Sequence, residues 1–98
     1  MAVCEESALL MVKQRLNRMA SDESLDEYFR QRIWAAEAEL EGTGISLTDS
    51  ADDLMLVVDY TVWQYQNRDN AGGMPDWLRL RRRERWLRQR REGNENDS

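Results

Sequence analysis

Residues 54–66 read LMLVVDYTVWQYQ, and apolar side chains occupy nearly every side of a helix built from them up to Val58. A helix that is apolar all round is normally buried at the centre of a protein. Val, Thr, Tyr and Trp also favour β-strands, because they pack well on a pleated sheet. A strand of 13 residues without alternating apolar and polar positions would be unusual, however. We therefore predict a helix here and expect it to be the central helix of a bundle.

The residues just before this stretch predict where the helix begins. Ser50 or Asp49 suits the N-cap, because a side-chain oxygen there accepts a hydrogen bond from a backbone N–H of the first turn. Asp52 and Asp53 would then lie near the positive end of the helix dipole, and we interpret both as helix-start residues. Since the chain has no His and a single Cys, we expect neither a metal site nor a cofactor.

Two amphipathic segments precede the central stretch. Ser24 and Glu27 have the spacing of a capping box at the start of the second segment, and Gly42 is placed to end it. We predict helices at Glu5–Met19 and from Ser24 to Gly42, because apolar residues recur there every three or four positions. These apolar stripes consist of Leu9, Val12, Leu16 and Met19 in the first helix, and of Leu25, Phe29, Ile33, Ala36 and Leu40 in the second.

Turn residues flank the central helix on both sides. Residues 42–50 hold two glycines and two apolar side chains, so we expect a loop that packs under the neighbouring helices. Residues 68–73 form a second connector, and Pro75 suits the first position of a following helix, where its missing N–H costs nothing. We predict that this fourth helix spans Trp77–Glu92 and that Gly93–Ser98 form a flexible polar tail.

One small domain accounts for all of these elements. A chain of 98 residues is long enough for a single core, which we expect to lie within residues 1–92. The predicted fold is all-α, a small bundle of about four helices with short loops and an Arg-rich C-terminal helix. The residues expected to pack its core are Leu25, Phe29, Ile33, Leu40, Leu54, Val58, Tyr60 and Trp63.

Charge is distributed unevenly along the chain. Residues 77–92 contain eight Arg and two Glu, a net charge of +6, whereas residues 1–76 contain six basic and 15 acidic residues, a net charge of −9. Three interpretations of the arginines stay open: pairing with carboxylates of another subunit or partner, contact with nucleic-acid phosphates, and simple solvation. The candidate residues for a subunit or partner interface are Arg79, Arg82, Arg83, Arg85, Trp77, Trp86 and Trp34.

A narrow apolar seam runs along the Arg-rich helix. Leu80 and Leu87 are seven residues apart, and Trp77 and Glu84 continue the same line. We expect the helix to dock on the bundle by this edge. A different set, Glu37, Glu39 and Glu41 of the second helix, alternates by two and is interpreted as a solvated face.

Composition argues against several classes of protein. Without His there is no Ser-His-Asp or Cys-His arrangement, and no Gly-rich phosphate loop is present, so we expect no enzyme. The longest apolar runs, at residues 8–12 and 54–58, are far too short to span a bilayer. Glu5 and Glu6 stand where a secretory signal would be positively charged. We therefore expect a cytoplasmic protein without membrane contact.

Motifs spread over residues 25–80 carry a family resemblance. They are Ala-Glu-Ala-Glu-Leu at 36–40, Gly-Ile-Ser-Leu at 44–47, Asp-Ser-Ala-Asp-Asp-Leu at 49–54, Asp59-Tyr60-x-x-Trp63-x-Tyr65-x-x-Arg68-Asp69, and Met74-Pro75-x-Trp77-Leu78. In this pattern the chain resembles the head–tail connector, or head completion, proteins of tailed bacteriophages and prophages. The first predicted helix is similar to the short N-terminal helix usual in that family. The Arg-dense stretch Arg79–Arg91 is not part of the resemblance.

The resemblance implies a structural virion assembly protein. Members of the family are small α-helical proteins that assemble as an oligomeric ring beneath the portal and join the DNA-filled head to the tail. The implied partners are the portal protein, tail or adaptor proteins, further copies of the chain and the packaged DNA. The implied locations are the host cytoplasm during assembly and the head–tail junction of the virion. The alternative, from the residues alone, is a small DNA-binding regulator or packaging accessory that uses the Arg-rich helix on phosphates.

Overall fold

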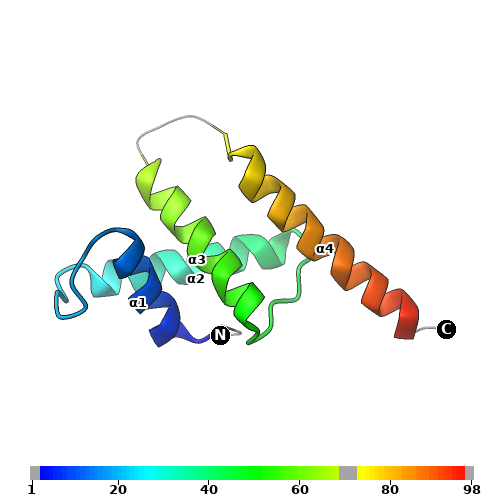
Figure 1. Ribbon diagram of the computed structural model, residues 1–98, viewed down its shortest axis with the longest axis horizontal. Helices are drawn as coiled ribbons and strands as arrows, with labels where there is room; N and C mark the ends of the chain where they lie inside the picture. The colour runs from blue at the N-terminus through cyan, green and yellow to red at the C-terminus, as the bar shows by residue number, and fades with distance from the viewer. Residues whose placement is uncertain (1–2, 69–72, 97–98) are drawn as a thin grey trace.

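Helices make up most of the protein, whose computed structural model describes residues 3–68 and 73–96, with side chains up to residue 92. The helices are α1 (Glu5–Arg15), α2 (Asp26–Gly42), α3 (Ala51–Gln66) and α4 (Asp76–Asn96), arranged as in Figure 1. These described residues contain no strand. The all-α prediction is therefore confirmed, and the strand alternative for residues 54–66 is wrong.

Helices α1, α2 and α3 each contact the other two and together enclose the core. The central helix α3 is buried without interruption from Leu56 to Val62, which is nearly two turns and therefore covers its whole circumference. This is the environment that its apolar sequence predicts. Among the residues predicted to pack the core, Phe29, Ile33, Leu40, Val58 and Tyr60 are buried, and Leu25, Leu54 and Trp63 are partly buried against them.

Helix α4 joins this three-helix body from one side. Within the described part of the chain, Leu78 is the one apolar side chain of α4 that is fully buried in the core. The C-terminal half of α4 extends away from the other helices (Figure 1), and the molecule measures 50 × 29 × 18 Å. Apolar burial of Leu78, with Trp86 partly buried against the same core, is therefore only part of the attachment of α4.

The first helix is shorter than predicted. α1 ends at Arg15 rather than Met19, because Asn17 has a φ of 59°, a left-handed conformation through which an α-helix cannot continue. Met19 is exposed to solvent. Its position matched the apolar spacing of the helix, but the backbone has turned away before reaching it.

The predicted capping box at the start of the second helix is wrong. The hydroxyl and the backbone N–H of Ser24 both donate to Oδ1 of Asp22, at 2.7 and 3.0 Å, so this hydroxyl is already used in a local turn. α2 begins at Asp26 instead, with Leu25 as its N-cap and no side-chain hydrogen bond to the helix end. Gly42 is the last residue of α2, as predicted.

The loop between α2 and α3 packs against the core, as predicted. Ile45 is buried, and Leu47 is partly buried against the same cluster. Ser50 is the N-cap of α3, and its Oγ accepts a hydrogen bond from the backbone N–H of Asp53 at 3.2 Å. This bond fixes the start of the central helix next to the loop.

The last helix differs from the prediction at both ends. It begins at Asp76, and the carbonyl of Pro75 accepts the first hydrogen bonds of the helix, so Pro75 precedes the helix rather than occupying its first position. The helical backbone continues to Asn96, beyond the predicted end at Glu92. The last two residues of the predicted flexible tail, 97–98, lie outside the described residues.

Candidate functional site

The side chains of α4 divide among distinct faces, because residues three or four apart lie on the same side of a helix. One face meets the rest of the chain, and a second points away from it. The docking face consists of Leu78, Arg81, Arg85, Arg88 and Gln89. The outer stripe consists of Leu80, Arg83, Leu87 and Arg90, while the half-exposed Trp77 borders a hollow that it lines with Asp59 and Trp63 of α3.

Arg85 makes the principal attachment of the docking face. Its Nε donates to Oδ1 of Asp53 at 2.7 Å, and its Nη2 donates to Oδ2 of Asp53 at 3.1 Å and to the carbonyl of Ser46 at 2.7 Å. Thr48 donates to the same Oδ2 from its backbone N–H at 2.7 Å and from its hydroxyl at 2.8 Å. The side chain of Asp53 is 1% exposed and that of Arg85 is 10% exposed. A buried ion pair therefore holds α4 against the start of α3.

Opposing influences act on the pKa of Asp53. Burial raises this pKa, but the hydrogen bonds from Arg85 and Thr48 outweigh burial and bring the pKa below its ordinary value. The hydrogen bond to Asp53 in turn raises the pKa of the Arg85 guanidinium. Each partner thus stabilises the charged form of the other.

A second carboxylate of α3 joins three helices. Asp59 is buried, and it accepts hydrogen bonds from Arg15 of α1, at 2.6 Å, and from Arg81 of α4. A buried carboxylate is tolerated only when it is paired, and these two guanidinium groups supply the pairing. Asp59 is therefore a structural junction between α1, α3 and α4.

Gln89 and Trp86 fasten α4 to the loop before α3. The side-chain amide of Gln89 donates to the carbonyl of Gly44 at 2.9 Å, and its Oε1 accepts the backbone N–H of Ser46 at 2.7 Å. Gly44 has a φ of 99°, and a Cβ at this position would lie 3.2 Å from Nε1 of Trp86. Glycine is favoured here both by the backbone conformation and by the nearby indole ring.

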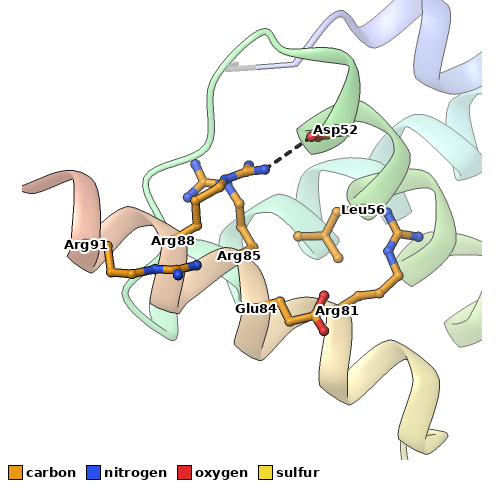
Figure 2. A pocket seen from close by; sticks show the side chains of 7 residues that line it. All are labelled: Asp52, Leu56, Arg81, Glu84, Arg85, Arg88 and Arg91. Atoms are coloured by element: carbon orange, nitrogen blue, oxygen red, sulfur yellow. Dashed lines mark hydrogen bonds and ion pairs between the residues drawn. The ribbon is translucent and has the colours of Figure 1, made fainter.

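An arginine-lined cleft of about 510 Å³ lies between α3 and α4 (Figure 2). Arg81, Arg85 and Arg88 each pair with a carboxylate of α3. Figure 2 marks the 3.2 Å contact of Arg88 with Asp52. The cleft is lined by Asp52, Leu56, Arg81, Glu84, Arg85, Arg88 and Arg91. Its positive charge is largely neutralised by these pairs, so it is a poor site for an anion.

A second hollow, of about 250 Å³, differs in charge from this cleft. This basic hollow is lined by Thr43, Arg79, Arg82, Arg83 and Trp86, none of which is acidic. Arg79 pairs with the exposed Asp76 at 3.4 Å, a contact that contributes little. Arg82 and Arg83 form no ion pair with a carboxylate in the described part of the chain. The basic hollow therefore keeps its positive charge.

Tyr60 lies at the edge of the core near this hollow. Its hydroxyl donates to Oε2 of Glu39 at 2.6 Å, and Gln64 donates to the same oxygen at 2.9 Å. Burial, together with the bond to Glu39, raises the pKa of Tyr60 to about 12, although Arg82 opposes the shift. The phenol is thus held in its neutral form.

The outer stripe of α4 faces solvent. Leu80 is 56% exposed, Leu87 is 40% exposed and Trp77 is 51% exposed. The prediction that α4 docks by this apolar seam is wrong. Arg81 and Arg85 reach buried carboxylates on α3, and this requirement turns the docking face inward and the seam outward.

The outward side of α2 carries a stripe of opposite charge. Its members are all exposed and follow each other in steps of four, three, four and three residues. Trp34, a candidate interface anchor, is 44% exposed, and a hollow of about 420 Å³ lies against it, Ala38 and Glu41. The acidic stripe consists of Glu27, Gln31, Trp34, Ala38 and Glu41. Glu37 is buried, so its assignment to the solvated face is wrong.

The structure separates the candidate interface residues into two groups. Arg79, Arg83, Trp34 and Trp77 are exposed, while Arg82 and Trp86 are partly buried. Arg85 is largely buried in its ion pair with Asp53, so its guanidinium is already paired within the same chain. The role of the exposed members at an interface stays a prediction.

The structural roles of Asp53 and Asp59 were missed at the sequence level. Asp53 was interpreted only as a helix-start residue, and Asp59 was given no role. A signal was present for Asp59, because a carboxylate inside an otherwise apolar helix must find a cation. The identities of those cations, Arg15 and Arg81, come from distant parts of the chain and have no local signal.

The chain matches no protein-family model, no curated protein and no solved structure. In the parts of the chain that are described, no helix combines the length and apolar character needed to cross a membrane. Over the same residues, no group of three or more Cys, Asp or Glu side chains is arranged to hold a metal ion.

Proposed function

We propose that this chain is a structural adaptor of virion assembly, a head–tail connector that joins the portal of a phage head to the tail as a ring of subunits and catalyses no reaction. One observation carries the proposal most directly. The outer stripe of α4 exposes Leu80 and Leu87, and Trp77 near the start of the helix is also about half exposed. Exposed apolar side chains that share one face of a helix with arginines are typical of a contact with another protein.

The motifs that resemble the connector family support the same proposal, because they serve the architecture of this chain. Ser50 caps α3, Asp53 holds α4, and Asp59 joins three helices. Ala36 and Leu40, from the motif in α2, are buried in the core.

The first test is the DNA that flanks the gene, followed by assembly with the encoded neighbour. We expect portal and major capsid genes upstream and tail genes downstream. The portal protein encoded there should bind this chain as a ring, which native mass spectrometry and electron microscopy of the purified mixture can detect. Leu80→Glu with Leu87→Glu should abolish that assembly, because it places two charges on the outer stripe.

A matched control uses exposed apolar residues elsewhere. Leu10 is 45% exposed on α1, and Met19 is exposed after it. Leu10→Glu with Met19→Glu adds the same charge and should leave assembly with the portal unchanged. Neighbouring genes of metabolism or regulation, together with no binding of the wild-type chain to a portal, would overturn the proposal.

The basic hollow favours a second candidate, a small DNA-binding protein. Arg79, Arg82 and Arg83 line it, no acidic residue belongs to its lining, and guanidinium groups bind phosphates well. Fluorescence titration with duplex DNA of arbitrary sequence separates the candidates. Binding whose logarithm falls linearly with the logarithm of salt concentration, and which Arg82→Glu with Arg83→Glu abolishes, would favour the DNA-binding candidate.

A further inference from the structure

We infer that copies of this chain bind one another head to tail, with the outer stripe of α4 in one copy packed against the acidic stripe of α2 in the next. The inference rests on the proposed function in one respect, since it specifies how subunits of a ring would meet. The observations that support it concern the two stripes of this chain and do not involve the portal.

The two stripes match in geometry. Leu80, Arg83, Leu87 and Arg90 follow steps of three, four and three residues, and the stripe on α2 from Glu27 to Glu41 alternates steps of four and three. Surfaces with this spacing are those that helices present to each other in side-by-side packing. The stripe on α4 is about 15 Å long and that on α2 about 21 Å, at a rise of about 1.5 Å per residue. One stripe can therefore lie along the other.

The stripes also match in charge. Arg83 and Arg90 give the outer stripe a net charge of +2, and Glu27 and Glu41 give the acidic stripe a net charge of −2. Neither arginine pairs with a carboxylate among the described side chains, and Glu41 pairs with no described cation. Glu27 has only a 3.9 Å contact with Arg30 in the same helix. Charges left over within one copy would be satisfied between two copies.

Apolar side chains fill the space between these charges. Leu80 and Leu87 project from α4, whereas the hollow of about 420 Å³ on α2 is lined by Trp34 and the small Ala38 together with Glu37 and Glu41. A leucine seated in this hollow would cover the exposed face of Trp34. Aromatic anchors surrounded by polar groups carry much of the binding energy at protein interfaces.

A second copy fits the outer stripe better than nucleic acid does. Base stacking would need open aromatic faces along the stripe, but on α4 the ring of Trp86 is covered by Arg90 at 4.8 Å and meets Gly44 at its edge, which leaves the half-exposed Trp77 at one end of the helix. Leucines also alternate with arginines on the outer stripe, and a leucine side chain makes no favourable contact with a phosphate backbone. The acidic stripe of another copy uses both kinds of side chain.

The contact joins two different surfaces, so it is heterologous and can repeat from copy to copy. α2 begins at the end of the molecule opposite the free end of α4 in Figure 1. Such contacts close into rings or continue as filaments, depending on the rotation between neighbours. The expected products are therefore oligomers larger than a dimer.

The test exchanges the charges of the two stripes and measures the mass distribution of the chain alone by analytical ultracentrifugation. Arg83→Glu with Arg90→Glu, and separately Glu27→Arg with Glu41→Arg, should each weaken self-association about tenfold or more. The variant with all four substitutions should associate again, because every pair is restored with its signs exchanged. This result does not depend on which arginine faces which glutamate.

The control and the contrary outcomes are as follows. Arg18→Glu with Arg68→Glu makes the same charge change away from both stripes and should associate as the wild type does, and circular dichroism should show unchanged helix content in every variant. A wild-type chain that stays monomeric or stops at a dimer would overturn the inference, as would single-stripe variants that associate normally or a fourfold variant that fails to recover.

If the portal binds the chain while the stripe variants change nothing, the inference fails and the proposed function stands. If the stripes drive self-association but no portal binds, the inference stands and the proposed function fails.

Discussion

The three-helix body and α4 are held in place by different forces. In the body, side chains such as Phe29, Ile33 and Val57 are buried against one another. Helix α4 adds Leu78 and the partly buried Trp86 to this core and is otherwise attached by hydrogen bonds and ion pairs, chiefly to Asp53 and Asp59. The stability of the body depends mainly on buried apolar area, whereas the attachment of α4 depends mainly on the geometry of a few polar contacts.

This difference has a physical consequence. Apolar burial stabilises roughly in proportion to area and tolerates small shifts. A buried ion pair requires good geometry, because its Coulomb attraction must offset the cost of removing both charges from water. The ion pairs therefore orient α4 more than they stabilise the protein, and they decide which of its faces is left for a partner.

The largest expected effect is a substitution in the body. Phe29→Ala removes a buried ring that lies edge-on to Tyr65, with centroids 5.4 Å apart, and should lower the free energy of unfolding by about 3–5 kcal/mol. Thermal unfolding followed by circular dichroism should show one transition at a much lower temperature. Loss of α4 alone, with the body still folded, would contradict the assignment of the core.

A substitution at the buried ion pair should separate the two regions. Asp53→Ala leaves the guanidinium of Arg85 buried without its carboxylate, at a cost of about 3 kcal/mol. We expect α4 to detach first, so limited trypsin digestion should cut at its arginines faster while the helices of the body persist.

The same position offers a rescue and a control. Asp53→Leu with Arg85→Met should recover much of the loss, because no buried charge is left unpaired. Asp52→Ala, at the exposed neighbour, should leave the digestion pattern unchanged. Equal digestion of the Asp53 and Asp52 variants would mean that the ion pair does not hold α4.

Tyr60 lies at the edge of the core, near the basic hollow of α4, and its pKa can be measured. Because this pKa rises from 10.0 to about 12, the neutral phenol contributes stability that is full below pH 10.0 and is lost as the pH rises toward 12. The contribution is on the order of 2 kcal/mol. Tyrosinate absorbance should show a late titration that Tyr60→Phe removes and that Glu39→Gln moves to lower pH. A profile unchanged by Glu39→Gln would contradict the part played by the carboxylate.

A smaller effect is expected in the loop that receives α4. Gly44→Ala should cost about 1–2 kcal/mol, because alanine is strained at a φ of 99° and its Cβ would approach Trp86 at 3.2 Å. Gly42→Ala is the matched control, since nothing lies within 4 Å of a Cβ there. Chemical denaturation should show a loss for the first variant and no loss for the second.

The smallest effect should come from an exposed pair of the docking face. The side chains of Arg88 and Asp52 are 43% and 77% exposed, and Arg88→Ala should change the free energy of unfolding by less than about 1 kcal/mol. Arg85→Ala, three residues earlier, should cost several times more. Similar values for the two arginines would remove the distinction between buried and exposed attachments.

Much of the body could be predicted because its signals are local. The apolar run at 54–58 and the amphipathic stretch that follows it predicted the central helix, and Ser50 was one of two predicted N-caps. The errors came from competing local bonds and backbone turns. Asp22 accepts the hydrogen bond of the Ser24 hydroxyl, and the left-handed backbone at Asn17 ends α1 before Met19. A pattern of residue types does not reveal which of two nearby acceptors a hydroxyl will choose.

Amino-acid order was sufficient for the helical class of this protein, for its central helix and for the presence of a basic helix at its C-terminal end. Each of these depends on residues within a few turns of one another. The orientation of α4 could not be obtained in this way. Eight arginines are distributed around that helix. The folded body places the buried carboxylates Asp53 and Asp59 on one side of it. Their positions determine which arginines turn inward and which remain exposed to a partner.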